Sequence, residues 1–345
     1  MKKVLYITNI EVPYRVRFFN ELAKHCELTV LYEKCTVEDR NETWAKSATT
    51  LHNRIFLRRE GMLFTGICKE LRREYDAIIV GCYNSPVQIL AMLYMCLRRI
   101  PFILNLDGEP FLTNKTVKTL LKKFFISAAE TILVAGEKAA ESVRQIVTNK
   151  QVIPYYFSSL DQNELQERRR KAIYCERNKT ILVVAQYLSV KGLDIVLEAA
   201  KKDQTLQYKF VGMGKRTEQF LQENSIPSNV EIIPFLQKED LEREYHSCAM
   251  LVLPSRQECW GLVINEAASF GMPIVSTWGS GAAVEFLADE YSQYLAQPGD
   301  AESLYKSIQE CRKSTRLNEY GEYLIYKSQD YSIEKSVHVH IGTLI

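Results

Sequence analysis

The sequence has no hydrophobic run of membrane-spanning length and almost no net charge. Its longest apolar stretch, residues 87–97, is too short to cross a bilayer and ends in Arg98 and Arg99. The 44 basic and 42 acidic residues leave a net charge of +2, so composition implies no general attraction to nucleic acid. Internal repeats and low-complexity tracts are also absent from the sequence. These features exclude a membrane-spanning or repeat architecture as the expected fold and favour an ordinary globular chain.

Paired cysteines are missing as well. The nine cysteines are scattered singly, with no C-x-x-C pair, and their number is odd. We therefore expect reduced, buried thiols in a cytoplasmic protein rather than disulfides or a zinc site. Cys259 is the cysteine nearest the candidate site described below, and we expect it to fill space. Residues 1–8 have the pattern of a first buried strand, and their apolar part is too short for a signal peptide.

Strand-like runs alternate with helical ones along the chain. In the first half the predicted strands are 3–8, 28–32, 77–80, 102–106, 131–135 and 152–154, and the predicted helices are 15–24, 86–97, 115–129 and 137–146. In the second half the strands are 180–185, 208–211, 230–234, 249–253 and 274–277, and the helices are 193–200, 217–223, 238–247, 263–270 and 301–312. A charged segment, 158–179, separates them as a linker with a surface helix. The alternation predicts an α/β fold with two doubly wound parallel sheets facing a cleft.

The segment 254–268 carries the clearest chemical pattern. An apolar run of strand length ends at Pro254, and a helical pattern begins after Gly261. Glu258 therefore lies in a loop after a strand, and Glu266 lies one or two turns into the next helix. In open α/β sheets such a loop faces the ligand crevice, so both carboxylates can reach one bound ligand.

Two glycine-containing junctions precede this segment. Lys191 and Gly192 stand before a predicted helix, where helix amides and their dipole favour an anion such as a diphosphate. Gly212 and Gly214 end another strand, as a tight turn or a ligand contact. The third glycine of a dinucleotide-binding fingerprint is absent, which argues against a dehydrogenase.

Together these segments resemble the retaining GT-B glycosyltransferases of family 4 (glycosyl transferases group 1). The residues that fit the family's E-x7-E pattern are Pro254, Ser255, Glu258, Gly261, Glu266 and Ala267. Lys191 and Gly192 resemble the end of the family's Arg-x4-Lys-Gly signature, whose two basic residues grip the donor diphosphate. Gln186 stands where the family has the arginine, and glutamine cannot offer its charged, bidentate fork.

The resemblance implies a role for each donor-side residue. Glu258 would hold sugar hydroxyls near the reacting centre, Glu266 the ribose hydroxyls, and Lys191 the leaving diphosphate. The segment 232–235 resembles the one whose backbone recognises the nucleobase, which leaves UDP and GDP open. The implied donor contacts besides Glu258 are Gln186, Lys191, Gly212, Gly214, Ile233, Trp260, Gly261, Leu262, Val263 and Glu266.

The first half supplies candidates for acceptor binding. Residues 12–15 resemble the Pro-Tyr-Arg subgroup common among bacterial surface-polysaccharide enzymes. Arg15 and Arg17 would face an anionic acceptor or form a solvated helix face. Asp107 and Glu109 follow a predicted strand, as substrate contacts or part of a turn. Many relatives carry a histidine in this region, whereas the five histidines here lie elsewhere in the sequence. The acceptor-side candidates are Glu11, Arg15, Asp107 and Glu109.

The resemblance implies an acceptor-binding Rossmann-like domain at 1–160 and a nucleotide-sugar-binding one at 161–325, with the tail 326–345 packed on the first. The expected reaction moves a hexose or hexosamine, with retention, from a UDP- or GDP-linked donor to a glycan or lipid-linked acceptor in polysaccharide biosynthesis. We expect neither a metal nor a cofactor besides the donor, and no nucleic-acid partner. A sugar-nucleotide epimerase of the same architecture stays open, as does a non-catalytic sugar-nucleotide-binding protein, which Gln186 favours.

Residues 115–126 form a basic, amphipathic pattern. Such a helix can lie on anionic lipid, with Phe124, Phe125 and Ile126 inserted and Lys122 and Lys123 at the phosphates. It can equally pack its apolar side on a sheet. The first alternative would bring a cytoplasmic enzyme to the inner face of the membrane.

Overall fold

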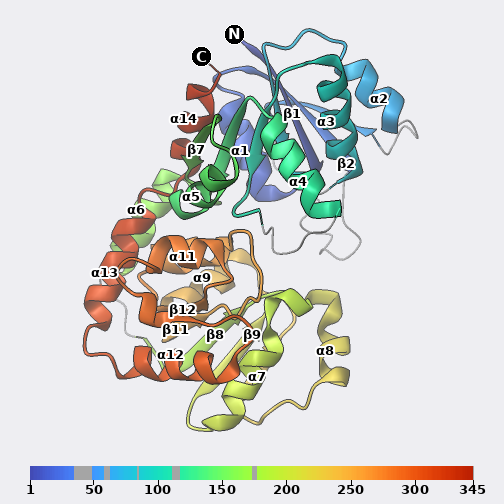
Figure 1. Cartoon of the computed structure of the whole chain (residues 1–345). Helices are drawn as coiled ribbons and strands as arrows, with labels where there is room; N and C mark the ends of the chain where they lie inside the picture. Colours follow the sequence, from blue (N-terminus) through green and yellow to red (C-terminus); the bar gives the residue numbers. More distant parts are fainter. Residues whose placement is uncertain (35–48, 58–62, 84, 111–116, 173–176, 345) are drawn as a thin grey trace. The chain divides into compact units, whose positions relative to one another are not determined.

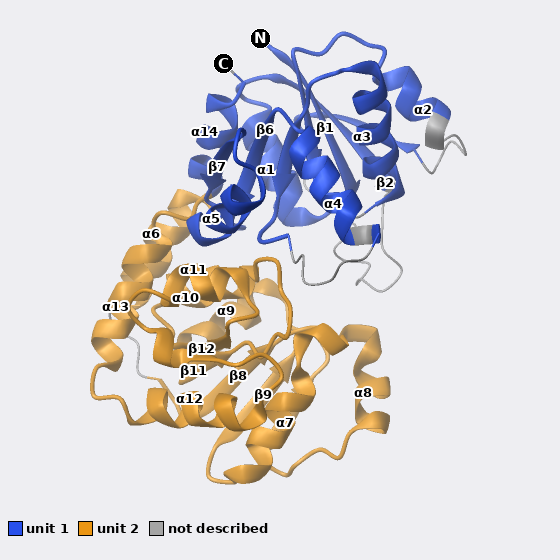
Figure 2. Cartoon of the chain, in the orientation of Figure 1, with its two compact units in different colours: residues 1–159, 333–345 blue, residues 160–332 orange. Residues whose placement is uncertain are grey.

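The computed structural model describes the whole chain except residues 35–48, 58–62, 84, 111–116, 173–176 and 345. The chain forms two compact units (Figure 2). Unit 1 comprises Met1–Ser159 together with Ile333–Ile345, and unit 2 comprises Leu160–Ser332. Each unit contains one parallel β-sheet with helices packed on it, which confirms the predicted α/β fold with two doubly wound sheets.

Unit 1 is built on a parallel sheet of strand order β3-β2-β1-β4-β5-β6-β7 (Figure 1). Its strands are β1 Lys3–Ile10, β2 Glu27–Lys34, β3 Asn53–Phe56, β4 Ala77–Gly81, β5 Ile103–Leu106, β6 Thr131–Ala135 and β7 Gln151–Tyr155. Its helices are α1 Pro13–Leu22, α2 Leu63–Glu70, α3 Pro86–Arg98, α4 Val117–Ala128, α5 Glu137–Ile146 and α14 Ile333–Gly342.

Strand β1 shows why this sheet is buried on both faces. Successive side chains of a strand point to opposite faces, and every residue from Val4 to Thr8 is buried. Leu5 and Ile7 belong to a core shared with α2, α3, α4 and α5. Tyr6 contacts Phe19 of α1 on the other face.

Unit 2 repeats the arrangement with the order β10-β9-β8-β11-β12-β13, again all parallel. Its strands are β8 Thr180–Val184, β9 Gln207–Val211, β10 Val230–Ile233, β11 Met250–Val252, β12 Ile274–Thr277 and β13 Leu295–Ala296. Its helices are α6 Gln162–Ala172, α7 Leu193–Lys202, α8 Thr217–Glu223, α9 Lys238–Ser247, α10 Leu262–Ser269, α11 Gly281–Leu287, α12 Ala301–Lys313 and α13 Leu317–Ser328.

The strand order reverses direction once in each sheet. The reversal lies between β1 and β4 in unit 1 and between β8 and β11 in unit 2. Doubly wound sheets bind ligands at this point, outside the carboxyl ends of the strands. In unit 2, β8 leads to Gln186 and Lys191, and β11 leads to Glu258, so the topology brings these residues to one edge of the sheet.

Helix α4 differs from the basic membrane helix expected at 115–126. Its first two predicted residues lie outside the described residues. Phe125 and Ile126 are buried in the core of unit 1, so the expectation that they insert into lipid is wrong. Phe124 is 49% exposed, and it shares one helix face with three other exposed apolar residues: Val117, Leu120 and Leu121. In the described part of the chain, no helix combines the length and apolar character needed to cross a membrane.

The cysteines agree only partly with expectation. Cys26, Cys68, Cys248 and Cys311 are free and buried, whereas Cys82 and Cys96 are half-buried. Cys259 is exposed, so it does not fill space in the core, contrary to the expectation.

Candidate active site

The loop that carries Lys191 is fixed against the loop that carries Glu258. Lys191 ends a short 3-10 helix, Ser189–Lys191, and Gly192 follows with a φ of +68°. A Cβ at position 192 would collide with the carbonyl oxygen of Pro254, so only glycine allows this approach. The backbone N–H of Arg256 then donates to the Val190 carbonyl at 2.8 Å. Gly192 is therefore a structural requirement for joining the two loops.

Arg256 adds a second tie between these loops. Its guanidinium donates to both carboxylate oxygens of Asp194, at 2.8 and 2.6 Å, and to the Ser189 carbonyl at 2.8 Å. This fork keeps the pKa of the Asp194 carboxyl below its usual value. Because Asp194 lies in the first turn of α7 and Ser189 starts the 3-10 helix that ends at Lys191, Arg256 holds residues on both sides of Lys191 in place.

Lys191 and Glu258 form an ion pair within the joined loops. Their side chains are 21% and 18% exposed, so solvent and ligands can still reach them. The sequence prediction that both residues contact one ligand is consistent with this geometry, and their roles stay predictions.

The backbone of Glu258 is also hydrogen-bonded to the loop before α11. Its N–H donates to the Gly279 carbonyl at 2.8 Å, and its carbonyl accepts from the Gly281 N–H at 3.1 Å. A Cβ at Gly279 or Gly281 would collide with the Arg256 or Cys259 carbonyl oxygen, respectively. These two glycines therefore have a structural role, because they allow the Glu258 loop to lie close.

Glu266 lies just over one turn into α10 and is positioned by residues that sequence reasoning missed. The Tyr245 hydroxyl donates to Glu266 Oε2 at 2.9 Å. Tyr245 is buried, and burial together with the nearby Glu266 charge raises the pKa of its hydroxyl. No sequence pattern links α9 to α10, so this pair could be found only from the structure.

Arg168 also stabilises helix α10, through contacts near its C-terminal end. Arg168 lies in the segment 158–179, where the sequence predicts a surface helix, but its side chain is buried and pairs with Glu242 at 2.5 Å. It also donates to the Ser269 hydroxyl at 3.1 Å, and that hydroxyl donates to the Glu266 carbonyl at 2.6 Å. Arg168 thus connects α6 to the turn of α10 that carries Glu266.

The Gly212 and Gly214 turn is held by β10. Their backbone N–H groups donate to the Ile233 and Pro234 carbonyls at 3.3 and 2.8 Å. Both glycines have positive φ angles, +99° and +55°. The sequence left open whether these glycines form a tight turn or contact a ligand, and the hydrogen bonds support the tight turn. Ile233 itself is half-buried.

The Trp260 side chain, one of the predicted donor contacts, is buried. Its indole is 2% exposed, donates to Asn265 Oδ1 at 2.8 Å and packs on Tyr331. The side chain therefore belongs to the core of unit 2, and a donor contact at this position stays a prediction for its backbone. Gly261 immediately precedes α10, whose first residues, Leu262 and Val263, are half-buried. Gln186 is exposed after β8.

In unit 1 the candidate acceptor residues form two ion pairs. Arg15 is buried and pairs with Asp107, which also accepts from the Tyr155 hydroxyl at 3.2 Å. Arg15 therefore forms no solvated helix face, and its charge is balanced by Asp107. Glu11 pairs with Arg54 at 3.1 Å, and Glu109 is exposed. Arg17, the other arginine of α1, donates to the Ser159 carbonyl at 2.7 Å.

A histidine does approach this edge, although none is near it in sequence. His340 of α14 lies with Nε2 at 2.6 Å from Asn105 Oδ1, and Asn105 Nδ2 donates to the Tyr155 hydroxyl at 3.0 Å. His340 is buried, and burial lowers its pKa to about 4. Its Nδ1 also lies 2.7 Å from the Ser336 carbonyl oxygen, so the ring is held between Ser336 and Asn105 next to the Asp107 region.

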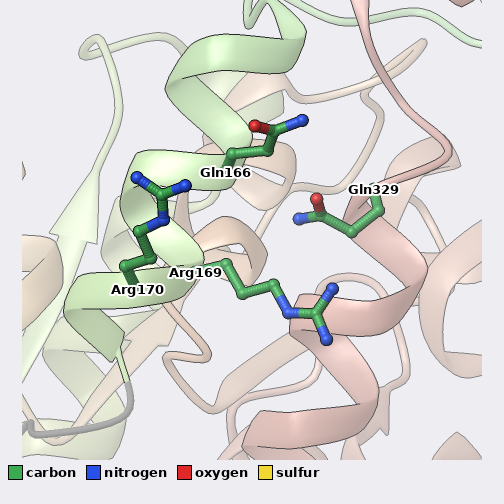
Figure 3. Close-up of a pocket in the computed structure, with 4 residues that line it drawn as sticks. All are labelled: Gln166, Arg169, Arg170 and Gln329. Atoms are coloured by element: carbon green, nitrogen blue, oxygen red, sulfur yellow. The ribbon is translucent and has the colours of Figure 1, made fainter.

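A surface hollow of about 400 Å³ lies elsewhere in unit 2 (Figure 3). It is lined by Gln166, Arg169 and Arg170 of α6 and by Gln329, which follows α13. None of these is a candidate donor residue, so the hollow is separate from the site built around Lys191 and Glu258. Among the residues that the structure describes, no group of three or more His, Cys, Asp or Glu side chains could hold a metal ion.

Comparison with known proteins finds a family model that matches most of unit 2. Residues 165–330 match the family model of the glycosyl transferases group 1. The chain carries a glycosyl transferases group 1 domain. An uncharacterized glycosyltransferase of Methanocaldococcus jannaschii is 28% identical, over 75% of this chain and 72% of the relative. The O-antigen chain mannosyltransferase C of Escherichia coli is 24% identical, over 74% and 70%. The protein is accordingly a glycosyltransferase.

Solved structures show the same fold as this glycosyltransferase. HepE from Anabaena, in complex with UDP and glucose, superposes with a TM-score of 0.72 at 15% identity, over 100% of this chain and 99% of that one. The GT-B fold expected from the sequence is confirmed by this likeness. The site residues were not tested by these comparisons and stay predictions.

Proposed function

We propose that this glycosyltransferase is a retaining, family 4 enzyme. It would move a hexose or hexosamine from a UDP- or GDP-linked donor to a glycan or lipid-linked acceptor in polysaccharide biosynthesis. One observation carries the proposal: Lys191 and Glu258 form a reachable ion pair at the strand-order reversal of unit 2. This is the place where doubly wound sheets bind nucleotides.

The chemistry of the pair suits sugar transfer from a diphosphate. A leaving diphosphate gains negative charge as the bond to the sugar breaks, and the fixed ammonium of Lys191 stabilises that charge. Glu258 is released from Lys191 as the diphosphate takes its place, and it accepts hydrogen bonds from sugar hydroxyls. Glu266, held by Tyr245, accepts from the ribose hydroxyls. HepE, which has the same fold, binds UDP and glucose, and this supports a nucleotide-sugar donor.

The acceptor is assigned to unit 1. Asp107 and Glu109 follow β5 at the carboxyl edge of the sheet, where they can accept hydrogen bonds from acceptor hydroxyls. The relative that forms an O-antigen chain supports a polysaccharide acceptor. We place the enzyme in the cytoplasm, where it would meet a lipid-linked acceptor at the inner face of the membrane.

Incubation with a panel of nucleotide sugars, with and without glycan acceptors, tests the proposal. Transfer predicts free nucleoside diphosphate in an acceptor-dependent amount and a new glycosidic bond of the same anomeric configuration as the donor. An epimerised donor would instead favour the epimerase alternative. Binding of nucleotide sugars without turnover, across the panel, would favour a non-catalytic binding protein.

A further inference from the structure

Among the described residues assigned to the proposed diphosphate site, Lys191 is the only cation. A nucleoside diphosphate brings more than one negative charge, whereas the charge of Lys191 is shared with Glu258. Gln186, which follows β8, contributes no charge. Since a partly buried anion is stabilised when its charge is compensated, a further cation near this edge of the sheet would strengthen binding beyond what Lys191 and the start of α7 provide.

Arg216 lies beside Gln186. It ends the 3-10 helix Gly214–Arg216, which follows β9, the neighbour of β8. Val184 and Val211 are paired at the carboxyl ends of these two strands, so the segments after them start side by side. The Arg216 guanidinium donates to the carbonyl of Tyr187 at 3.3 Å. It therefore contacts the backbone of the residue directly after Gln186.

Tyr187, whose carbonyl accepts from Arg216, is itself held by several contacts. The Tyr187 hydroxyl donates to Glu223 of α8 at 2.5 Å and accepts from Asn224 at 3.3 Å. Its ring lies edge-on to Phe220, with 4.9 Å between the ring centroids. These contacts tie the loop after β8 to α8. A guanidinium has five N–H donors in a planar fork, a geometry that suits phosphate oxygens as well as a carbonyl.

We propose that Arg216 is the second cation of the donor diphosphate site, and that it replaces in space the basic residue missing at position 186. The proposal rests on the proposed function, since it assumes a nucleoside diphosphate at this edge. It explains how the site binds its ligand with a glutamine at position 186. Arg216 is assigned to binding of the phosphates, and Glu258 and Lys191 keep their assigned roles.

Calorimetric titration of the full chain with UDP and GDP, and with uridine and guanosine, tests the assignment. Arg216→Gln should lower the affinity for the preferred diphosphate about tenfold or more, the scale of one lost charge-assisted hydrogen bond. Affinity for the nucleoside should stay the same. The matched control is Lys215→Gln, which removes an adjacent charge on the same 3-10 helix and should change diphosphate affinity by less than about twofold.

A double variant tests whether Arg216 takes the place of an arginine at position 186. Adding Gln186→Arg to Arg216→Gln should restore most of the lost diphosphate affinity, because a guanidinium is returned to the same place by the neighbouring strand. If Arg216→Gln does not fold, Arg216→Lys keeps the charge and loses the fork, and a loss of about threefold or more is expected. Unchanged diphosphate affinity in the folded Arg216 variant would overturn the assignment. So would an equal loss for nucleoside and diphosphate, or an equal loss in Lys215→Gln.

The same titrations separate this assignment from the proposed function. If the wild type binds neither UDP nor GDP, the donor site itself is wrong, and with it the role of Arg216. If the wild type binds a diphosphate and Lys191→Gln weakens binding while Arg216→Gln does not, the proposed function stands and the Arg216 assignment alone is wrong.

Discussion

At the scale of single residues, the ion pair of Glu258 with Lys191 gives the sharpest prediction. Glu258→Ala and Glu266→Ala should each lower transfer by at least about a hundredfold, the usual cost of losing one preorganised polar contact in a transition state. Steady-state kinetics with the donor identified in the panel measures this. Both side chains are partly exposed, so the fold should survive both substitutions. Glu266→Ala should still cost about 1–3 kcal/mol of stability, because it removes the acceptor of the buried Tyr245 hydroxyl.

Glu198→Ala is the matched control for these variants. Glu198 is also paired with a lysine, Lys201, but on the exposed surface of α7. It should leave transfer unchanged. Near-normal turnover in Glu258→Ala would show that this carboxylate is not at the reacting centre.

Tyr245 gives a second residue-scale prediction, because it acts through Glu266. Tyr245→Phe removes the hydroxyl that donates to Glu266 Oε2 and leaves the packing in place. We expect the donor KM to rise by about three- to thirtyfold with little change in kcat, since the ribose is bound in both the ground and transition states. Stability should fall by about 1–3 kcal/mol, the cost of a lost hydrogen bond to a charged group.

Tyr320→Phe separates positioning from general stability. Tyr320 is also fully buried in unit 2, and its hydroxyl donates to the Ile274 carbonyl at 2.8 Å. It should cost stability as well, yet leave the donor KM unchanged. Equal effects of the two variants on KM would mean that Tyr245 has only a structural role.

The candidate site shows what sequence can and cannot predict at this scale. Lys191 and Glu258 belong to short patterns placed after strands, so the rule for parallel sheets brings them together. Tyr245, Arg168 and His340 carry no such pattern, because their contacts join segments far apart in the chain. Burial is equally hidden in the sequence: Trp260 was assigned to the donor, and it packs in the core.

At the scale of elements, prediction depended on the length of the apolar runs. The buried strands β4 and β6 and the helices α3 and α5 are continuous, and they lie where the sequence places them. Strand β3 was missed because its residues, Asn53–Phe56, include two polar ones, and β13 was missed because it has only two residues. The close approach of loops at Gly192 and Gly279 also could not be predicted, because it depends on which segments meet.

Arg177 provides an element-scale prediction, since one guanidinium contacts the ends of two helices. It donates to the carbonyls of Tyr245, His246 and Cys248 at the end of α9, and to the Phe270 carbonyl after α10. Carbonyls at a helix end otherwise lack partners. Arg177→Ala should therefore lower the free energy of unfolding by about 2–4 kcal/mol. Urea denaturation measures this.

The control for Arg177 is Arg169→Ala, which removes an exposed arginine of α6. It should stay within about 0.5 kcal/mol of the wild type. Arg177→Lys should restore little, because an ammonium cannot reach carbonyls of both helices with the geometry of the fork. Full stability in Arg177→Lys would mean that charge alone matters.

Helix α4 gives a prediction of membrane binding, through exposed residues that differ from those expected from the sequence. Its exposed apolar face is formed by Val117, Leu120, Leu121 and Phe124, next to the exposed Lys123. Lys122 lies over the Tyr83 ring, at 5.6 Å from its centroid. We expect the protein to sediment with anionic vesicles at low salt, and the double change Leu120→Ser and Phe124→Ser to release it. Added salt should weaken binding.

Leu221→Ser is the control for α4, since Leu221 is equally exposed on α8 of unit 2. It should leave sedimentation unchanged. A wild type that ignores anionic vesicles at low salt would show that α4 is an ordinary surface helix and would favour a soluble acceptor.

At the scale of the whole molecule, the two units differ in how they should respond to acid. His52 and His340 both lie in unit 1, and burial lowers the pKa of each to about 4. The charges of Arg54 and Arg15, respectively, act in the same direction. An unfolded histidine titrates near 6.5, so between pH 6.5 and 4 the unfolded chain binds protons that the folded chain does not. Stability should therefore fall as pH falls through this range.

The expected loss is about 2 kcal/mol for each histidine between pH 6.5 and 5, a range above the titration of most carboxylates. Denaturation midpoints measured from pH 7.5 to 5 give the slope. His340→Gln should lower stability at pH 7, because it removes a buried partner of Asn105, and should also reduce the slope. His338→Gln changes an exposed histidine two residues away on the same helix and should leave the slope as it is. A slope that His340→Gln does not reduce would mean that His340 is already protonated in the folded state, with Nε2 donating to Asn105 and Nδ1 to the Ser336 carbonyl.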